Sequence, residues 1–351
     1  MKLKKRILLA PLDWGIGHAT RCIPLIKALL KHDYEVILAA DQRPMHLLNT
    51  EFPKLKMIRL GGYNIKYSNH LPLALSMLFQ TPRLIWSIKK EYYELKKIIN
   101  DYKIDFVISD NRFGLHSNKI PTVFITHQLQ IRSTYFTNLI QKINYQYINK
   151  FDVCWVIDDK KINLAGNLSQ PKILPNNTKY IGIQSRFQKY KTKSKYQFMA
   201  IVSGPEPQRT VLEKVLIKAL KDRKEKSLIL LGKPEKKYSK IKGNLTIKSH
   251  LNSDDLNLAI LQSNLIISRP GYSTIMDLLK LDKKAIFIPT PGQTEQEYLG
   301  KKLMQEGICY MQNQNKFNFE KAILKSKMYS GFMDINQLNT DWTELFRIFP
   351  K

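Results

Sequence analysis

The sequence is poor in acidic residues. It has 29 Asp and Glu against 57 Lys and Arg, which gives a formal net charge of +28. Such an excess is typical of chains that bind nucleic acid, an anionic membrane surface or phosphorylated substrates. A lysine-rich composition would produce the same charge with most of the lysines simply solvated. The charge therefore admits anionic partners without requiring them.

Cysteines are also few, and long apolar runs are missing. Cys22, Cys154 and Cys309 are far apart, with no CxxC pair or His/Cys cluster, so neither a disulfide framework nor a zinc site is supported. We therefore expect a protein of a reducing compartment, in the cytoplasm or at the inner face of the cell membrane. No run approaches the ~20 apolar residues of a membrane span, and the run at 7–10 is too short for a signal peptide.

Several nucleotide-binding and metal-binding motifs are incomplete or missing. There is no Walker P-loop, and the glycine motif that begins at Gly15 has Thr20 where a dinucleotide fingerprint needs Gly or Ala. Asp41 could still bind a ribose, so an NAD-dependent oxidoreductase stays an alternative. No RRM, KH or zinc-finger signature is present, and we expect no nucleic-acid partner. The acidic pairs at 158–159 and 254–255 lack DxD spacing, so we expect no cofactor and no essential metal.

The sequence does contain enough apolar material for two domains. Hydrophobic residues make up 43% of the 351 residues, and aromatic residues make up 10%. The charged, apolar-poor stretch 189–196 is the best candidate for a linker. We therefore predict an N-terminal domain over 1–188 and a C-terminal domain over 197–336. A final helix within 337–351 is expected to pack back on the N-terminal domain.

Short apolar runs alternate with helical patterns in both halves of the chain. The expected strands are 6–10, 35–40, 105–110, 121–128, 153–158 and 180–183, then 198–202, 227–232, 245–248 and 265–267, with helices at 19–31, 207–221 and 254–262. This alternation predicts an α/β fold of two Rossmann-like domains facing a cleft. Functional groups at the carboxyl ends of parallel strands fall in the ligand crevice, so the polar residues after these strands are the candidate site.

In the first half, the loop Gly15-Ile16-Gly17-His18 joins a strand to a helix. Its glycines let a ligand approach the backbone, and the helix N-terminus favours negative charge. His18 could act as general base on an acceptor hydroxyl, and Asp110 at the end of another strand could orient it. Helix capping by His18 and a turn role for Asp110 are the simpler alternatives.

In the second half, the loop Ser203-Gly204-Pro205-Glu206-Pro207-Gln208-Arg209 follows the first strand. Gly204 could bring backbone N–H groups to a phosphate, and Arg209 could pair with it through two N–H groups. Arg186 and Arg269 also lie in or near predicted crevice loops. Arginines and helix dipoles there would stabilise a diphosphate leaving group without a metal. A plain strand-to-helix connection is the alternative.

The most informative stretch is Ser268-Arg269-Pro270-Gly271-Tyr272-Ser273-Thr274-Ile275-Met276-Asp277, which predicts a strand end, a glycine turn and a helix start. A carboxylate at Asp277 can accept two hydrogen bonds from ribose hydroxyls. In the following polar loop and helix, Gln296 and Glu297 could contact sugar hydroxyls, although both could equally be surface residues.

An unusual region between residues 71 and 99 combines apolar bulk with clustered lysines and the aromatic residues Trp86, Tyr92 and Tyr93. This combination suits an interfacial surface that contacts an anionic membrane or a lipid acceptor. Two ordinary amphipathic helices packed against the sheet are the simpler expectation.

Residues 265–307 resemble the donor-binding segment of GT-B glycosyltransferases of the MurG type, the family 28 C-terminal domain. The stretch from Ser268 to Asp277 and the loop 289–296 carry the resemblance, and the loop at 15–18 resembles that family's N-terminal glycine loop. The resemblance implies transfer of a hexose or N-acetylhexosamine from a UDP-linked donor, with inversion and without a metal. The acceptor, which could be lipid-linked, stays open, as does contact with an anionic membrane.

The residue patterns and the resemblance together select a set of site residues. On the donor side these are Gly17, Arg186, Ser203, Gly204, Arg209, His250, Leu251, Arg269, Gly271, Tyr272, Ser273, Thr274, Asp277, Gln293, Gln296 and Glu297. On the acceptor side they are Asp13, Trp14, Gly15, His127 and Gln128, with His18 and Asp110 as the catalytic pair. The resemblance implies that backbone near positions 250 and 251 meets the uracil.

This sequence departs from the family's pattern at several positions. Asp277 stands where Glu is usual, and Glu297 stands where a second Gln is common. The proline-containing loop at 203–207 replaces a glycine-rich loop. These differences leave the sugar and the acceptor open. The alternative functions are an epimerase or hydrolase of nucleotide-sugars on the same fold and, on charge alone, a basic nucleic-acid-binding protein.

Overall fold

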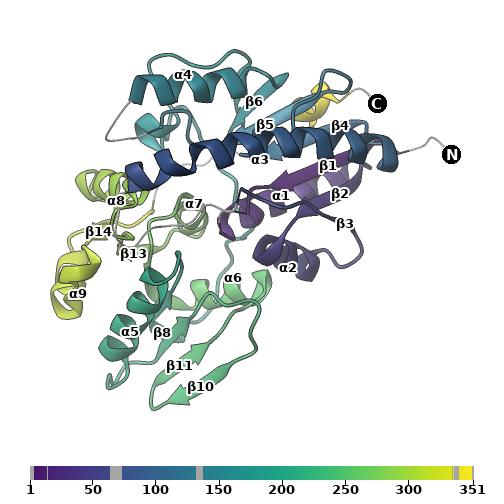
Figure 1. Ribbon diagram of the computed structural model, residues 1–351. Helices are drawn as coiled ribbons and strands as arrows, with labels where there is room; N and C mark the ends of the chain where they lie inside the picture. Colours follow the sequence, from purple (N-terminus) through teal and green to yellow (C-terminus); the bar gives the residue numbers. More distant parts are fainter. Residues whose placement is uncertain are drawn as a thin grey trace. The chain divides into compact units, whose positions relative to one another are not determined.

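The fold was examined in a computed structural model, which describes residues 4–13, 15–63, 73–131, 137–333, 335 and 340–349 (Figure 1). The chain divides into two compact units. Met1–Gln184 and Gln337–Lys351 form the first, and Ser185–Asn336 forms the second. Each unit contains a mainly parallel sheet with helices, which confirms the predicted α/β fold of two Rossmann-like domains.

The sheet of the first unit is parallel throughout its described strands, in the order β3-β2-β1-β4-β5-β6-β7. The strands are β1 (Arg6–Pro11), β2 (Glu35–Ala40), β3 (Lys56–Arg59), β4 (Phe106–Asp110), β5 (Thr122–Thr126), β6 (Val153–Val156) and β7 (Thr178–Tyr180). The helices are α1 (Gly17–Lys31), α2 (Gln42–Glu51), α3 (Leu73–Tyr102) and α4 (Thr137–Ile148). The chain runs from β1 to β2 on one side and later to β4 on the other, so the strand order reverses beside β1.

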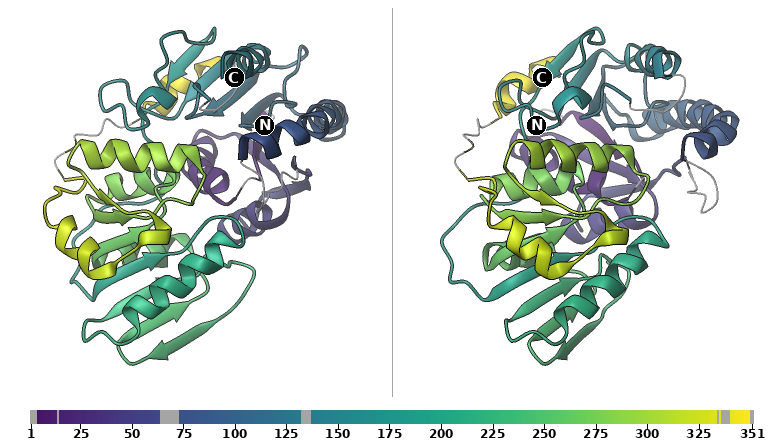
Figure 2. Two further views of the ribbon diagram at one scale, coloured as in Figure 1. Left: turned by 60° about the vertical axis from the view of Figure 1, so that its left-hand side comes forward. Right: turned by 90° about the vertical axis from the view of Figure 1, so that its left-hand side faces the viewer.

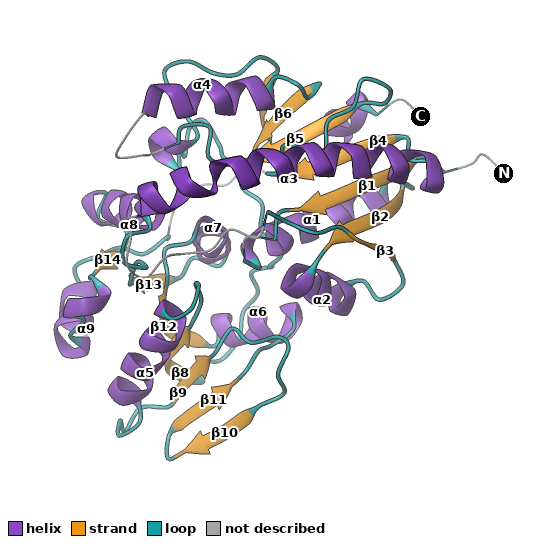
Figure 3. Cartoon of the chain, in the orientation of Figure 1, coloured by secondary structure: helices purple, strands orange, loops and turns teal. Residues whose placement is uncertain are grey.

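One face of this sheet is covered by α3, whose long ribbon runs along the strands in Figure 3. Leu95 and Ile98 of α3 are buried in one cluster with Leu8, Ile37 and Val107 of three neighbouring strands. Strands enclosed by helices need apolar residues over their whole length, which explains the continuous apolar runs in the sequence. This packing fixes the strand ends from which the first unit's polar residues project.

The sheet of the second unit has the order β10-β11-β9-β8-β12-β13-β14, and all pairs are parallel except β10 with β11. The strands are β8 (Tyr196–Ile201), β9 (Ser227–Leu230), β10 (Ser239–Lys242), β11 (Leu245–Lys248), β12 (Ser263–Ser268), β13 (Lys284–Phe287) and β14 (Tyr310–Met311). The helices are α5 (Gln208–Leu220), α6 (Ser253–Leu261), α7 (Tyr272–Lys280), α8 (Thr294–Gln305) and α9 (Phe319–Ser326). Here the order reverses beside β8.

The C-terminal segment contributes the short helix α10 (Trp342–Leu345) and a 3-10 turn (Phe346–Ile348). The Phe349 ring lies 4.8 Å from the Phe106 ring and 5.9 Å from the Trp155 ring, measured between centroids, and all three are buried. Figure 2 shows this segment, in yellow, beside the strands of the first unit. These aromatic contacts attach the end of the chain to the core of that unit.

Three local predictions were wrong. Residues 71–99 were expected to form two helices, but one helix, α3, continues through Pro82 as far as Tyr102. The strand expected at 180–183 lies at Thr178–Tyr180. The hairpin strand β10 was not predicted, because its four exposed residues carry no apolar pattern that burial would impose.

Candidate functional site

The first unit brings its polar strand ends together beside β1. Pro11 at the end of β1 lies opposite Asp110 at the end of β4, and α1 begins six residues after Pro11. Ligands of doubly wound sheets bind where the strand order reverses, outside the carboxyl ends of the strands. The candidate catalytic residues therefore occupy the position that the topology favours for a site.

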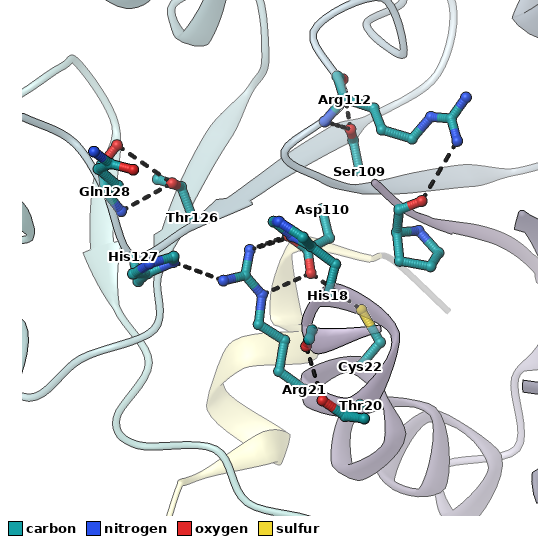
Figure 4. A network of polar contacts seen from close by, with 12 residues as sticks. His18, Thr20, Arg21, Cys22, Ser109, Asp110, Arg112, Thr126, His127 and Gln128 are labelled. Carbon is teal, nitrogen blue, oxygen red and sulfur yellow. Dashed lines mark hydrogen bonds and ion pairs between the residues drawn. The ribbon is translucent and has the colours of Figure 1, made fainter. Parts of the chain in front are cut away.

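His18, in the first turn of α1, contacts Asp110 directly. His18 Nδ1 lies 3.0 Å from Asp110 Oδ1 (Figure 4). The Asp110 side chain is fully buried and that of His18 is 13% exposed. The structure thus brings together the two residues that the sequence selected as a catalytic pair.

Arg21, one helical turn after His18, completes a network that the sequence analysis missed. Its Nε donates a 2.7 Å hydrogen bond to Asp110 Oδ2, and its Nη2 forms an ion pair with Asp110 Oδ1. Its Nη1 lies 2.6 Å from Nδ1 of His127, which follows β5. The i, i+3 spacing from His18 was the available signal, because residues three apart share one helix face.

Burial opposes ionisation of Asp110, but the Arg21 guanidinium and the His18 ring outweigh burial and hold the pKa of this carboxyl well below its usual range. Burial, followed by the positive charge of Arg21, lowers the pKa of His18, against the opposing effect of Asp110. The carboxylate is therefore ionised at neutral pH, and the His18 imidazole is neutral. A neutral imidazole oriented by a carboxylate can accept a proton from a hydroxyl group.

The structure describes three of the other predicted acceptor-side residues. The backbone N–H of Gln128 donates a 3.0 Å hydrogen bond to Thr126 Oγ1. The Asp13 side chain rests on Gly62, where an added Cβ would come within 1.8 Å of Asp13 Oδ1. Gly15 is exposed and has a φ of +87°, while Trp14 lies outside the described residues.

A buried ion pair holds the neighbouring loops in place. Arg112, just after β4, binds Glu91 of α3, and both side chains are almost inaccessible. Glu91 also accepts hydrogen bonds of 2.9 Å from the Tyr63 hydroxyl and the Gly114 N–H. A buried charge pair of this kind is tolerated only when its remaining hydrogen-bonding groups are satisfied. The pair connects α3 to the loops after β3 and β4.

The second unit has a corresponding polar cluster beside β8. Gly204 follows β8 with a φ of +106°, which favours glycine, and a Cβ there would meet Thr290 Oγ1 at 3.3 Å and Arg269 Nε at 3.8 Å. Within the part of the chain that the structure describes, Thr290 Oγ1, Arg269 Nε and the neighbouring Ser268 Oγ are buried without a hydrogen-bond partner. Buried polar atoms that lack partners are rare, and they are a place to look for a missing ligand.

Arg269 in this cluster is 1% exposed, yet no carboxylate among the described residues pairs with it. Its Nη1 donates to the carbonyls of Ile288 and Pro289 at 2.9 and 2.8 Å. Its Nη2 donates to the Gln208 carbonyl at 3.1 Å and to the Gln314 side chain. Burial lowers the pKa of Arg269 to about 10. The arginine therefore carries an uncompensated positive charge at the strand ends, which suits an anion.

Arg209 also lies in this loop, but its guanidinium already has partners within the second unit. It forms an ion pair with Glu206 and donates a 3.1 Å hydrogen bond to the Leu231 carbonyl. Its side chain is buried, whereas Ser203 beside Gly204 is partly exposed. A phosphate that binds Arg209 would have to compete with Glu206.

Asp277, on α7, contacts the first residue of the second unit. Its Oδ1 accepts a 2.6 Å hydrogen bond from the Ser185 hydroxyl. Burial raises the pKa of Asp277 to about 6, against the opposing effects of Arg186 and of the Ser185 hydrogen bond. Arg186 Nη1 donates a 3.1 Å hydrogen bond to Ser253 Oγ at the start of α6. The Ser185 contact could not be predicted from a local pattern, since the two residues are 92 positions apart.

The remaining predicted donor residues lie in loops and at helix starts of this unit. Gln296 Oε1 accepts a 2.8 Å hydrogen bond from Thr290 N, and Glu297 Oε1 accepts a 3.1 Å bond from Gly292 N. Both side chains therefore shape the loop after β13. Around them, Gln293 caps α8, Gly271 caps α7, Tyr272, Ser273 and Thr274 form the first turn of α7, and His250 and Leu251 follow β11. Gly17, in the first unit, is the first residue of α1.

Neither a metal-binding cluster nor a membrane-spanning helix is found among the described residues. No group of three or more His, Cys, Asp or Glu residues in the described ranges could hold a metal ion. None of the helices in those ranges combines the length and apolar character needed to cross a membrane.

Comparison with protein families gives matches to both halves of the chain. Residues 5–199 match the family described as "Glycosyl transferase family 1". Residues 201–345 match the "Glycosyltransferase family 28 C-terminal domain". The first match covers more than half of the chain.

Individual relatives cover most of the chain at low identity. An uncharacterized glycosyltransferase of Methanosarcina acetivorans is 23% identical over 335 residues, covering 85% of this chain and 83% of that protein. The UDP-N-acetylglucosamine–N-acetylmuramyl-(pentapeptide) pyrophosphoryl-undecaprenol N-acetylglucosamine transferase of Buchnera aphidicola is 24% identical over 338 residues, covering 91% and 88%. The crystal structure of the glycosyltransferase SnogD from Streptomyces nogalater matches with a TM-score of 0.64 at 11% identity, covering 99% of both chains. The structural match supports the GT-B fold.

Proposed function

The chain is a glycosyltransferase that belongs to glycosyl transferase family 1, and we propose that it transfers a sugar from a UDP-linked donor to an acceptor hydroxyl. The proposed sugar is a hexose or an N-acetylhexosamine. The name of the Buchnera relative, which includes both UDP-N-acetylglucosamine and an undecaprenol carrier, supports a donor and an acceptor of these classes.

The observation that carries this proposal is the uncompensated charge of Arg269. A diphosphate bound over Gly204 would supply the missing anion and give partners to the buried Arg269 Nε and Thr290 Oγ1 atoms. The glycine leaves room for such a group, because a side chain at position 204 would meet both atoms. Asp277 is the proposed ribose ligand, whose carboxylate would accept hydrogen bonds from the two hydroxyls.

In the proposed reaction, His18 Nε2 accepts the proton of the acceptor hydroxyl. The hydroxyl oxygen attacks the anomeric carbon from the side opposite the nucleotide, and the bond from that carbon to the diphosphate oxygen breaks. One substitution of this kind inverts the anomeric centre. The leaving UDP gains negative charge, which Arg269 and the N-terminus of α7 would stabilise. We therefore propose that the reaction needs no metal.

The exposed face of α3 supports a membrane-bound or lipid-linked acceptor. Ile85, Trp86 and Tyr93 are 41%, 63% and 63% exposed. Five basic residues of the same helix are also exposed, namely Arg83, Lys89, Lys90, Lys96 and Lys97. Aromatic and basic side chains on one helix face suit the surface of an anionic bilayer. We propose that this face contacts such a membrane, at its cytoplasmic side.

A labelled-donor assay tests the proposal. The intact protein is incubated with UDP-N-acetylglucosamine or UDP-glucose, each carrying a labelled sugar, and with a bacterial lipid extract. Label in a lipid product, with full activity in EDTA, is the expected result. Release or interconversion of the sugar without any acceptor would instead favour a hydrolase or epimerase. Failure of every UDP-sugar to raise the unfolding temperature would contradict the donor class.

A further inference from the structure

Arg21 contacts three ionisable side chains from three separate elements of the first unit. It forms a bidentate interaction with Asp110 through Nε and Nη2. Its Nη2 also lies 2.9 Å from His18 Nδ1, and its Nη1 lies 2.6 Å from His127 Nδ1. The Arg21 residue is 4% exposed. Figure 4 shows it between the two histidine rings, with Asp110 beside it. Since it is enclosed by protein groups, it acts through its neighbours.

The chemistry of these contacts determines where His127 carries its proton. A guanidinium only donates hydrogen bonds, so His127 Nδ1 must accept, and the ring proton of His127 lies on Nε2. His18 Nδ1 lies between a donor, Arg21 Nη2 at 2.9 Å, and an acceptor, Asp110 Oδ1 at 3.0 Å, so these contacts orient the His18 ring without selecting one tautomer. Tautomers are assigned from such networks, because hydrogen positions follow from the partners available.

We propose that Arg21 is a positioning residue that fixes the tautomer of His127 and holds Asp110 in the position that orients His18. Asp110 alone would orient His18 but also make its protonated form more favourable. Arg21 balances that charge, so that His18 is oriented without becoming more basic. The kinetic consequence rests on the proposed function of His18 as base, whereas the His127 tautomer does not depend on it.

Among the residues that the structure describes, the ionisable groups that influence His18 come from three elements. Arg21 lies on α1, Asp110 ends β4, and His127 follows β5. The Cys22 thiol on α1 donates a 3.4 Å hydrogen bond to Asp110, and burial and Asp110 raise its pKa well above the ordinary value, so it adds no charge. Removing Arg21 therefore leaves one uncompensated carboxylate beside His18.

The first experiment is nitrogen-15 NMR of the histidine rings in the intact protein, which reports tautomers without any substrate. The expected wild-type result at pH 7 is a protonated Nε2 and an unprotonated Nδ1 on His127. In Arg21→Met we expect a tautomer mixture at His127 and a higher titration midpoint for His18, by about one pH unit. A protonated Nδ1 on His127 in the wild type, or an unchanged His127 tautomer and His18 midpoint in Arg21→Met, would overturn the proposal.

The second experiment separates charge from geometry by the pH dependence of kcat. Arg21→Met should lower kcat about 100-fold and move the acid limb to higher pH. Arg21→Lys keeps the charge but loses the planar fork, so its acid limb should stay near that of the wild type while kcat falls. Arg59→Met, at an arginine whose side chain is 78% exposed, serves as control and should change neither. A uniform loss of kcat with identical pH profiles in both Arg21 variants would indicate a purely structural role and contradict the proposal.

The role of Arg21 and the role of His18 as base can be disproved separately. If the wild-type His127 tautomer and its response to Arg21→Met are as expected but His18→Gln keeps full activity, the Arg21 assignment holds and the base assignment is wrong. If Arg21→Met does not fold, as judged by circular dichroism, the wild-type spectrum and the Arg21→Lys variant still decide the proposal.

Discussion

The Ser185 hydroxyl donates a 2.6 Å hydrogen bond to the Asp277 carboxylate, within the second unit of the chain. Despite this bond, burial raises the pKa of Asp277 to about 6. A buried carboxylate with a single hydroxyl donor is poorly solvated, and a ligand with further hydroxyl groups would improve its surroundings. Two predictions depend on this relationship.

The first concerns the pH dependence of donor binding. The ionised Asp277 can accept hydrogen bonds from both ribose hydroxyls, but the protonated form cannot. We therefore expect the Kd for UDP to rise as the pH falls below 6, by up to about tenfold per pH unit. Calorimetric titration between pH 5 and 8 measures this. Asp277→Asn should bind weakly at every pH, whereas Asp282→Asn, at an acid that pairs with exposed Lys189, should keep the wild-type dependence.

The second concerns stability. The pKa of about 6 in the folded protein exceeds the ordinary value of 3.8, so Asp277 stabilises the fold below pH 4 and this stabilisation is lost as the pH rises through 6. Asp277→Asn should therefore unfold at a higher temperature at pH 8, with a gain of up to about 3 kcal/mol. Near pH 4 the gain should disappear. An equal gain at both pH values would show that the carboxylate charge is not the cause.

Gly204→Ala tests the polar cluster at Arg269. A φ of +106° and the approach of Cβ to Thr290 and Arg269 should together destabilise the protein by about 1–2 kcal/mol and weaken UDP binding. Gly243→Ala is the matched control, because Gly243 also has a positive φ but has open space around a Cβ. The control should lose stability without losing UDP affinity. Equal UDP affinity in both variants would remove the diphosphate from this position.

His18→Gln tests the proposed base. Loss of the proton acceptor should lower kcat by about 10²–10⁴-fold. The affinity for UDP should not change, because every proposed donor ligand except Gly17 lies in the second unit and Gly17 is unaltered in this variant. Initial rates with saturating donor, together with calorimetric UDP titrations, measure the two effects. A variant with nearly normal kcat would show that another group accepts the proton.

The exposed face of α3 is tested with vesicles. Trp86→Ser combined with Lys89→Glu and Lys90→Glu should reduce cosedimentation with vesicles of 30% phosphatidylglycerol in phosphatidylcholine by about tenfold or more. Wild-type binding should weaken at high salt and be lost on vesicles of phosphatidylcholine alone. Ile241→Ser, at a residue that is 72% exposed on β10, is the control for general loss of apolar surface. Unchanged binding by the α3 variant would exclude this face as the contact.

Much of the architecture could be predicted because a buried parallel strand requires a continuous apolar run. The runs predicted at 6–10 and 105–110 are strands β1 (Arg6–Pro11) and β4 (Phe106–Asp110). Polar residues follow the carboxyl end of β1 in the loop to α1, and Asp110 ends β4. The pairing of His18 with Asp110 followed from that rule alone. Helix α3 was predicted less well, because two helices were expected where one continuous helix forms.

The sequence by itself determined the α/β class, the strand ends that carry polar groups, and the glycines that keep those ends open, since these depend on local pattern and backbone freedom. Only the tertiary structure decided which charges meet. It joined Arg21 to Asp110 and His127, left Arg269 without a carboxylate, and placed Ser185 against Asp277. Such contacts join residues up to 106 positions apart, and the register and packing of the sheets, which no local pattern encodes, bring them together.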